Sequence, residues 1–118
     1  MPHVLKYNDV EIATEIEFAR TILSQVKGLM FRKSIPPGFA MIFEMKKPSS
    51  VNVHMLFMRF PIDIIFLNEE KKTTGLYRLN PWSGYKAMAD IKYVIEMNAG
   101  TIEKYKLSIG GQMEFDDI

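Results

Sequence analysis

The chain has 118 residues, the length of one ordinary domain, and a domain of this size buries about two thirds of its unfolded surface. Apolar residues make up 47% and charged residues 25%, which is typical of a globular chain rather than a disordered or membrane protein. Fifteen basic and fourteen acidic side chains are interspersed and leave a net charge of +1, so the basic footprint of a duplex nucleic-acid-binding protein is missing.

The sequence contains no cysteine, which excludes thiol catalysis, disulfides and cysteine-ligated zinc or iron-sulfur sites. No apolar run reaches the length of a membrane span, and the first residues lack the pattern of a secretory signal. We therefore expect a cytoplasmic protein with no nucleic-acid or membrane partner, which leaves a small molecule or a protein. One domain over residues 1–118 is expected, with a frayed tail at 116–118, as a monomer or small homo-oligomer.

In the first third of the chain, apolar residues alternate with glutamates over residues 10–18, which is typical of a half-buried strand. Asn8 and Asp9 separate this strand from another at 4–7 and predict a hairpin. Residues 22–30 have a helical period, with Thr21 placed to cap the first turn and Gly28 to end the regular turns. A short helix is therefore predicted there.

The rest of the sequence predicts further strands at 39–45, 51–58, 62–67, 73–79, 91–97 and 112–115. Turns are predicted at 36–38, 46–50 and 68–72, and one helical turn at 101–106. Pro61 separates two of the strands because it has no N–H to donate to a ladder. Seven or eight short strands predict a mainly β fold: a single antiparallel β-barrel or sandwich, jelly-roll-like, with one or two short helices.

His54, Arg59 and Asp63 lie within an otherwise apolar stretch and could form a site for general acid–base chemistry, as in a hydrolase or lyase. The alternative is structural: Asp63 accepts backbone N–H bonds or pairs with an arginine such as Arg59, Arg32 or Arg20. We favour the structural reading because an unpaired buried charge is too costly to keep.

A metal site is not predicted. His3 and His54 share no local ligand spacing, and no carboxylate is marked as a further ligand. No cofactor is expected either.

The segment at residues 80–88, NPWSGYKAM, carries the sole tryptophan, Trp82, together with Tyr85. Exposed aromatic rings on such a loop could stack on a ligand or partner, with His54 and Arg32 as further ligand-binding candidates. Alternatively Trp82 folds inward and plugs one end of the barrel, which is the reading we favour. The leading functional hypothesis is a non-catalytic ligand-binding or protein-interaction domain; the alternatives are an enzyme built on Asp63 and His54, and a purely structural accessory protein.

Several fragments recur together, among them GLMFR at 28–32, HMLFMRFPIDIIFL at 54–67 and VIEMNAGTI at 94–102. In this order they resemble the domain of unknown function 192 family, and its archaeal branch most of all, from about residue 17 to residue 115. The resemblance implies a compact, mainly β barrel or jelly-roll-like domain and no assigned activity. The matching motif positions are Gly28, Leu29, Met30, Arg32, Met55, Pro61, Asp63, Phe66, Glu96, Ala99 and Gly100.

The chain departs from the family pattern in two places. Many members carry tryptophan, methionine and an asparagine-threonine pair before the proline, where this chain has His54, Met55, Phe57 and Met58. The usual Gly-Asp before the last strand is Gly-Gly here, at residues 110 and 111. A polar site built on those family residues is therefore not expected, and the remaining polar motif residues, Arg32 and Asp63, are expected to meet across the core.

Overall fold

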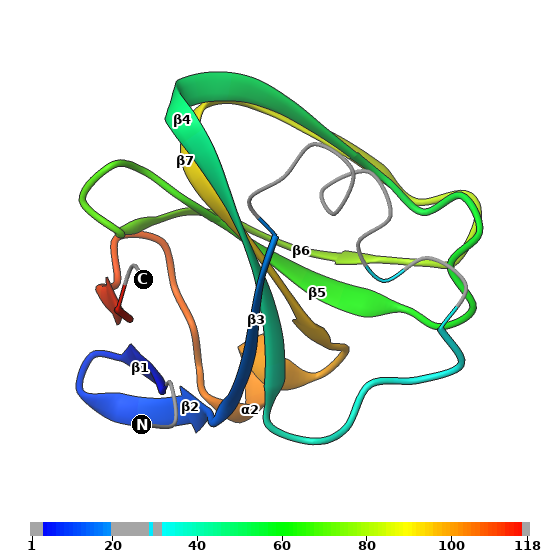
Figure 1. Ribbon diagram of the computed structural model, residues 1–118, viewed down its shortest axis with the longest axis horizontal. Coiled ribbons are helices and arrows are strands. Elements are labelled where there is room, and N and C mark those ends of the chain that lie inside the picture. Colours follow the sequence, from blue (N-terminus) through cyan, green and yellow to red (C-terminus); the bar gives the residue numbers. More distant parts are fainter. Residues whose placement is uncertain (1–3, 20–28, 30–31, 117–118) are drawn as a thin grey trace.

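The computed structural model describes residues 4–19, 29 and 32–116, and it shows two β-sheets with one short helix (Figure 1). The small sheet has three strands in the order β2-β1-β8, and the large sheet has five in the order β3-β4-β7-β5-β6. The mainly β, sandwich-like prediction is confirmed, although the described strands do not close into a barrel. The elements are β1 (Leu5–Tyr7), β2 (Val10–Ala13), β3 (Glu15–Ala19), β4 (Phe39–His54), β5 (Ile62–Leu67), β6 (Thr73–Leu79), β7 (Tyr85–Asn98), α2 (Thr101–Lys104) and β8 (Met113–Glu114).

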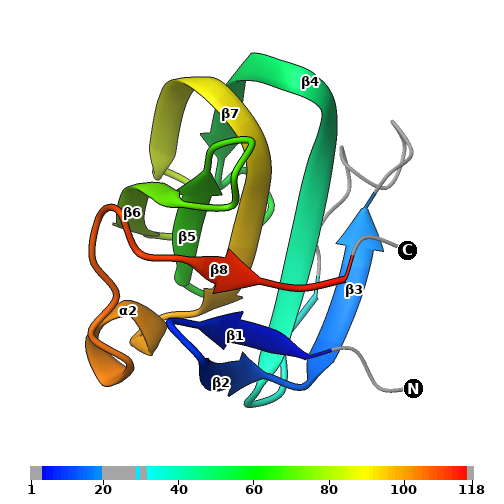
Figure 2. The same ribbon diagram turned by 90° about the vertical axis from the view of Figure 1, so that its left-hand side faces the viewer.

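The strand predicted over residues 10–18 is divided in two at Thr14. β2 belongs to the small sheet and β3 to the large sheet, so the chain changes layers at this residue (Figure 2). The carbonyl of Gly38 accepts the N–H groups of both Thr14 and Glu15, at 2.9 and 3.0 Å, and holds the crossing. β3 then pairs with β4 in parallel. The prediction of a purely antiparallel fold is therefore wrong for this pair of strands.

β4 and β7 pair antiparallel as a long, curled two-stranded ribbon that the sequence did not predict (Figure 1). The predicted turn at 46–50 is wrong, because β4 continues from Phe39 to His54 with irregular pairing around Ser49. The ammonium of Lys92 donates to the backbone carbonyls of Met45 and Lys46 beside this irregularity. The lysine thus satisfies acceptors that the ladder leaves open.

The large sheet is covered on both faces, which explains why every residue of β5 is buried. On one face, Ile65 and Leu67 pack with residues of the small sheet, such as Leu5 and Met113. On the other face, Ile64 and Phe66 belong to a second apolar cluster that also holds Leu29, Met41, Met55 and Met58. The strands predicted at 62–67 and 73–79 are confirmed, as is the helical turn at α2. The helix predicted at 22–30 lies outside the described residues except for Leu29, and so do the last two residues of the predicted tail.

Candidate functional site

Asp63 is fully buried in β5, and hydrogen bonds occupy both of its carboxylate oxygens. Oδ1 accepts from Nε of Arg78 at 3.2 Å. Oδ2 accepts the backbone N–H groups of Gly100 and Ile102, at 3.0 and 2.9 Å. The hydrogen bond and charge of Asp63 raise the pKa of the Arg78 guanidinium, which also contacts Glu103 at 3.3 Å. Asp63 therefore joins β5 to β6 and to the start of α2.

The structure corrects the predicted partner of Asp63. Arg32 pairs with Glu17 at 2.9 Å and lies over the ring of Phe39, so the expected contact between Arg32 and Asp63 is wrong. Arg78 stands directly opposite Asp63 in the register of β5 and β6. The predicted hairpin at 62–67 and 73–79 contained this signal, because its far end brings residues near 63 and 78 together. Arg20 and His3 lie outside the described residues.

His54, Arg59 and Asp63 do not form one site. His54 is exposed at the end of β4, where its Nδ1 accepts the N–H of Leu56 at 3.3 Å. Arg59 is exposed, whereas Asp63 has no exposed surface. Within the described part of the chain, no three histidine, aspartate or glutamate side chains gather as metal ligands would.

Two loops meet at one end of the molecule, at residues 55–61 and 80–84. The N–H of Met55 donates to the carbonyl of Gly84 at 3.0 Å, and the N–H of Trp82 donates to the carbonyl of Met55 at 2.8 Å. Met55 and Met58 are buried and anchor the first loop in the second apolar cluster. A Cβ on Gly84 would lie 2.7 Å from the carbonyl oxygen of Asn80, so only glycine fits where the loops cross. The two loops are therefore held together as one unit.

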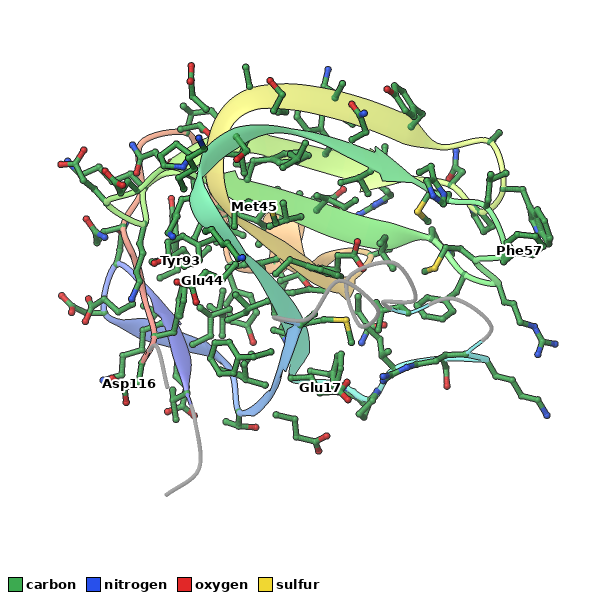
Figure 3. The ribbon with its side chains drawn as sticks, turned by 45° about the horizontal axis from the view of Figure 1, so that its top comes forward. Glu17, Glu44, Met45, Phe57, Tyr93 and Asp116 are labelled. Atoms are coloured by element: carbon green, nitrogen blue, oxygen red, sulfur yellow. The ribbon has the colours of Figure 1, made fainter. Side chains whose placement is uncertain are left out.

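Four large side chains on this unit and on the first residue of β7 are exposed to solvent, and together we call them the aromatic tip: Leu56, Phe57, Trp82 and Tyr85. Their exposed fractions are 47%, 44%, 56% and 59%. The rings of Phe57 and Trp82 meet edge to face with centroids 5.3 Å apart. Figure 3 shows Phe57 at the extreme end of the molecule. The prediction that Trp82 plugs the fold is therefore wrong, and the aromatic loop presents its rings to solvent.

The backbone of the aromatic tip is held in an uncommon conformation. Phe57 has φ of 63° and Trp82 has φ of 67°, in the left-handed region that bulky residues rarely adopt. Such strain persists only where the surroundings enforce it, and it clusters at ligand clamps and active sites. Here the hydrogen bond from the N–H of Trp82 to the carbonyl of Met55 joins the two loops and holds their backbone in place.

Sequence reasoning named Glu96 only as a family motif position and missed its energetic role. The side chain is 8% exposed in the middle of β7, directly opposite Met41 of β4 and Ile64 of β5. No hydrogen bond or ion pair joins its carboxyl group to another of the described residues. Burial raises the pKa of Glu96 to about 7. A single glutamate inside the apolar run of residues 91–97 was the available signal.

A cavity of about 200 Å³ lies at the other end of β7, among Ile12, Gly38, Asn98 and Tyr105. Pockets for drug-sized ligands usually measure about 300–1,000 Å³. None of the predicted ligand-binding residues lines this cavity. The cavity and the aromatic tip are therefore separate features.

The profile of domain of unknown function 192 (DUF192), described as an uncharacterized ACR family, matches residues 4–115. The chain belongs to the DUF192 family. A UPF0127 protein of Pyrococcus furiosus is 38% identical over 108 residues, covering 90% of each chain. One from Pyrococcus abyssi is 33% identical over 103 residues, covering 86% of each. The predicted family resemblance, with its archaeal character, is confirmed, and the DUF192 family has no assigned function.

Two solved structures share the DUF192 fold seen here. A Novosphingobium aromaticivorans protein of unknown function superposes with a TM-score of 0.84 at 25% identity, over 97% of this chain and 84% of the other. A Sinorhizobium meliloti protein superposes with a TM-score of 0.83 at 22% identity, over 98% and 94% of the two chains, and shows the fold alone. Among the described residues of this DUF192 chain, no helix is both long and apolar enough to cross a membrane.

Proposed function

We propose that this chain is a non-catalytic binding domain that docks on the surface of a partner through its aromatic tip. The observation that carries the proposal is the exposure of four large side chains on two loops joined by backbone hydrogen bonds and on the adjoining first residue of β7, with the rings of Phe57 and Trp82 in contact. A cytoplasmic location, expected from the sequence, is part of the same proposal.

The size of the aromatic tip supports a binding role. Aromatic side chains offer about 150–250 Å² each, so the exposed fractions of the four residues leave about 400 Å² of tip surface in water. Scattered apolar residues on a surface are ordinary, but a contiguous patch of a few hundred Å² is often functional. The two strained aromatic positions add to this argument, because a shorter polar residue would relieve the strain.

The chemistry of the remaining candidates supports a role without catalysis. The carboxylate of Asp63 is committed to Arg78 and two backbone N–H groups. A general base needs a reachable proton and a cleft for the substrate, and Asp63 has no exposed surface. His54 has no carboxylate partner among the described residues, and its Nδ1 accepts the N–H of Leu56 instead.

Trp82→Ala is expected to change the free energy of unfolding by less than about 1 kcal/mol, because the indole is mostly exposed. If Trp82 were instead a structural plug, the loss would be about 3–5 kcal/mol. Urea unfolding followed by circular dichroism distinguishes the two values. A loss in the upper range would contradict the view that the ring serves binding rather than folding.

The proposal is tested by placing the photo-crosslinker p-benzoylphenylalanine at Phe57 in cells that make the protein. Ile109 is the matched control, since it is 64% exposed and lies outside the aromatic tip. Its neighbour Gly110 bonds to Thr73, at the end of β6 that is farther along the strand from the loop at 80–84. We expect a discrete adduct, with protein or lipid, from position 57 and none from position 109. Equal yields at both positions, or no adduct at position 57, would overturn the proposed function.

A further inference from the structure

We infer that the aromatic tip docks on an anionic lipid surface, lying against the membrane without spanning it. This inference rests on the proposed function and names the partner of the same site. The alternative partner, another protein, is an outcome of the test below.

The charged side chains on the segments that carry the aromatic tip are all basic. Residues 54–61 and 80–88 contain no aspartate or glutamate, and their charged residues are Arg59 and Lys86. The whole chain, by contrast, carries nearly equal numbers of acids and bases, fifteen basic to fourteen acidic. A cationic flank beside an apolar tip complements anionic headgroups, where each lysine or arginine near the surface contributes about 1 kcal/mol.

The side chains of the aromatic tip match the layers of a bilayer surface. Tryptophan and tyrosine prefer the boundary between headgroups and acyl chains because each ring has an apolar body and a polar handle. The hydroxyl of Tyr85 donates to Oδ1 of Asn52 on β4 at 3.2 Å, so this polar group points toward the strand rather than away from the protein. Leu56 and Phe57 carry no polar group and are suited to shallow insertion among the acyl chains.

The four tip side chains offer about 400 Å² of surface, which suits shallow insertion into a bilayer, because a bilayer requires no complementary shape. The interloop hydrogen bonds also keep the backbone ordered in water, so insertion orders few additional groups.

The sequence-based expectation of no membrane partner rested on the absence of a long apolar run. That criterion detects spanning segments and is insensitive to a surface contact assembled from two loops. The loops at 55–61 and 80–84 are more than twenty positions apart in sequence and meet only through tertiary hydrogen bonds.

The test uses the fluorescence of Trp82, the only tryptophan in the chain, with vesicles of mixed phosphatidylglycerol and phosphatidylcholine. We expect a blue shift of the emission and sedimentation with these vesicles, weakened by salt, and neither effect with pure phosphatidylcholine. The affinity for these vesicles, measured by co-sedimentation, should fall at least tenfold in Phe57→Ala and about fivefold in Arg59→Gln. Ile109→Ala, the matched exposed control, should bind as the unchanged protein does.

Absence of binding to the anionic vesicles would overturn the lipid inference. Equal binding to neutral vesicles, or equal loss in Ile109→Ala and Phe57→Ala, would also overturn it. A protein adduct at position 57 combined with inert vesicles would overturn only the lipid inference, because the proposed binding function would stand. Failure of both experiments would overturn the two together.

Discussion

Asp63→Asn is expected to lower the free energy of unfolding by about 3 kcal/mol, although it changes the side chain by a single group. Urea unfolding near neutral pH measures this value. The expected loss comes from a mismatch of donors and acceptors in a site that water does not reach.

The geometry around Asp63 explains why asparagine cannot replace it. One carboxylate oxygen faces Nε of Arg78, and the other faces the N–H groups of Gly100 and Ile102. An asparagine amide has one accepting oxygen and one donating nitrogen. Whichever way the amide is turned, its NH₂ group faces a donor, and at least one buried hydrogen bond is lost.

Glu103→Gln is the matched control, because Glu103 contacts the same arginine at 3.3 Å but is 80% exposed. Surface ion pairs contribute little, so this variant should lose less than about 0.5 kcal/mol. Similar losses in the two variants would contradict the structural role assigned to Asp63. Full stability of Asp63→Asn would do so more directly, and would return Asp63 to the list of candidate functional groups.

Glu96→Gln is expected to stabilise the protein at pH 8 by about 3 kcal/mol, the opposite sign from Asp63→Asn. The pKa of Glu96 is about 7 in the folded protein and 4.5 in its ordinary state. Between these two values the folded protein binds more protons than the unfolded chain. The free energy of unfolding therefore falls as pH rises from about 4.5 to 7 and stays low above that window.

Glutamine has a similar shape and no charge, so it removes the cost of ionising a buried carboxyl. The difference in stability between Glu96→Gln and the unchanged protein should grow across the same pH window and level off above it. Glu114→Gln is the control, because the Glu114 side chain is exposed on β8, and it should show no such difference. A constant difference from pH 4 to 8 would mean that Glu96 is not the group responsible.

The buried carboxyl groups of Asp63 on β5 and Glu96 on β7 differ in the hydrogen bonds that offset their loss of hydration. Asp63 has three hydrogen bonds that offset the loss of hydration. Glu96 lies opposite methionine and isoleucine on the neighbouring strands, and none of the described residues gives its carboxyl group such a hydrogen bond. Glu96 therefore costs stability at neutral pH, and the fold retains it at a family motif position despite that cost.

Local sequence patterns were enough to predict the β class, the family and the hairpin between 62–67 and 73–79. Alternation of side chains and turn residues such as Asn68 act over a few positions, so a linear reading detects them. The same reasoning predicted that Asp63 would accept backbone N–H bonds or pair with an arginine, because the cost of an unpaired buried charge does not depend on knowing the fold.

Which residues meet depends on contacts between strands and loops that are distant in sequence. β4 continues through Pro48 because pairing with β7 outweighs the local turn signal, and Asp63 selects Arg78 because the hairpin register places them opposite each other. Trp82 is exposed because its N–H bonds to the carbonyl of Met55, in a loop far away in sequence. These outcomes depend on register and on contacts between distant segments, and single-residue propensities carry no information about either.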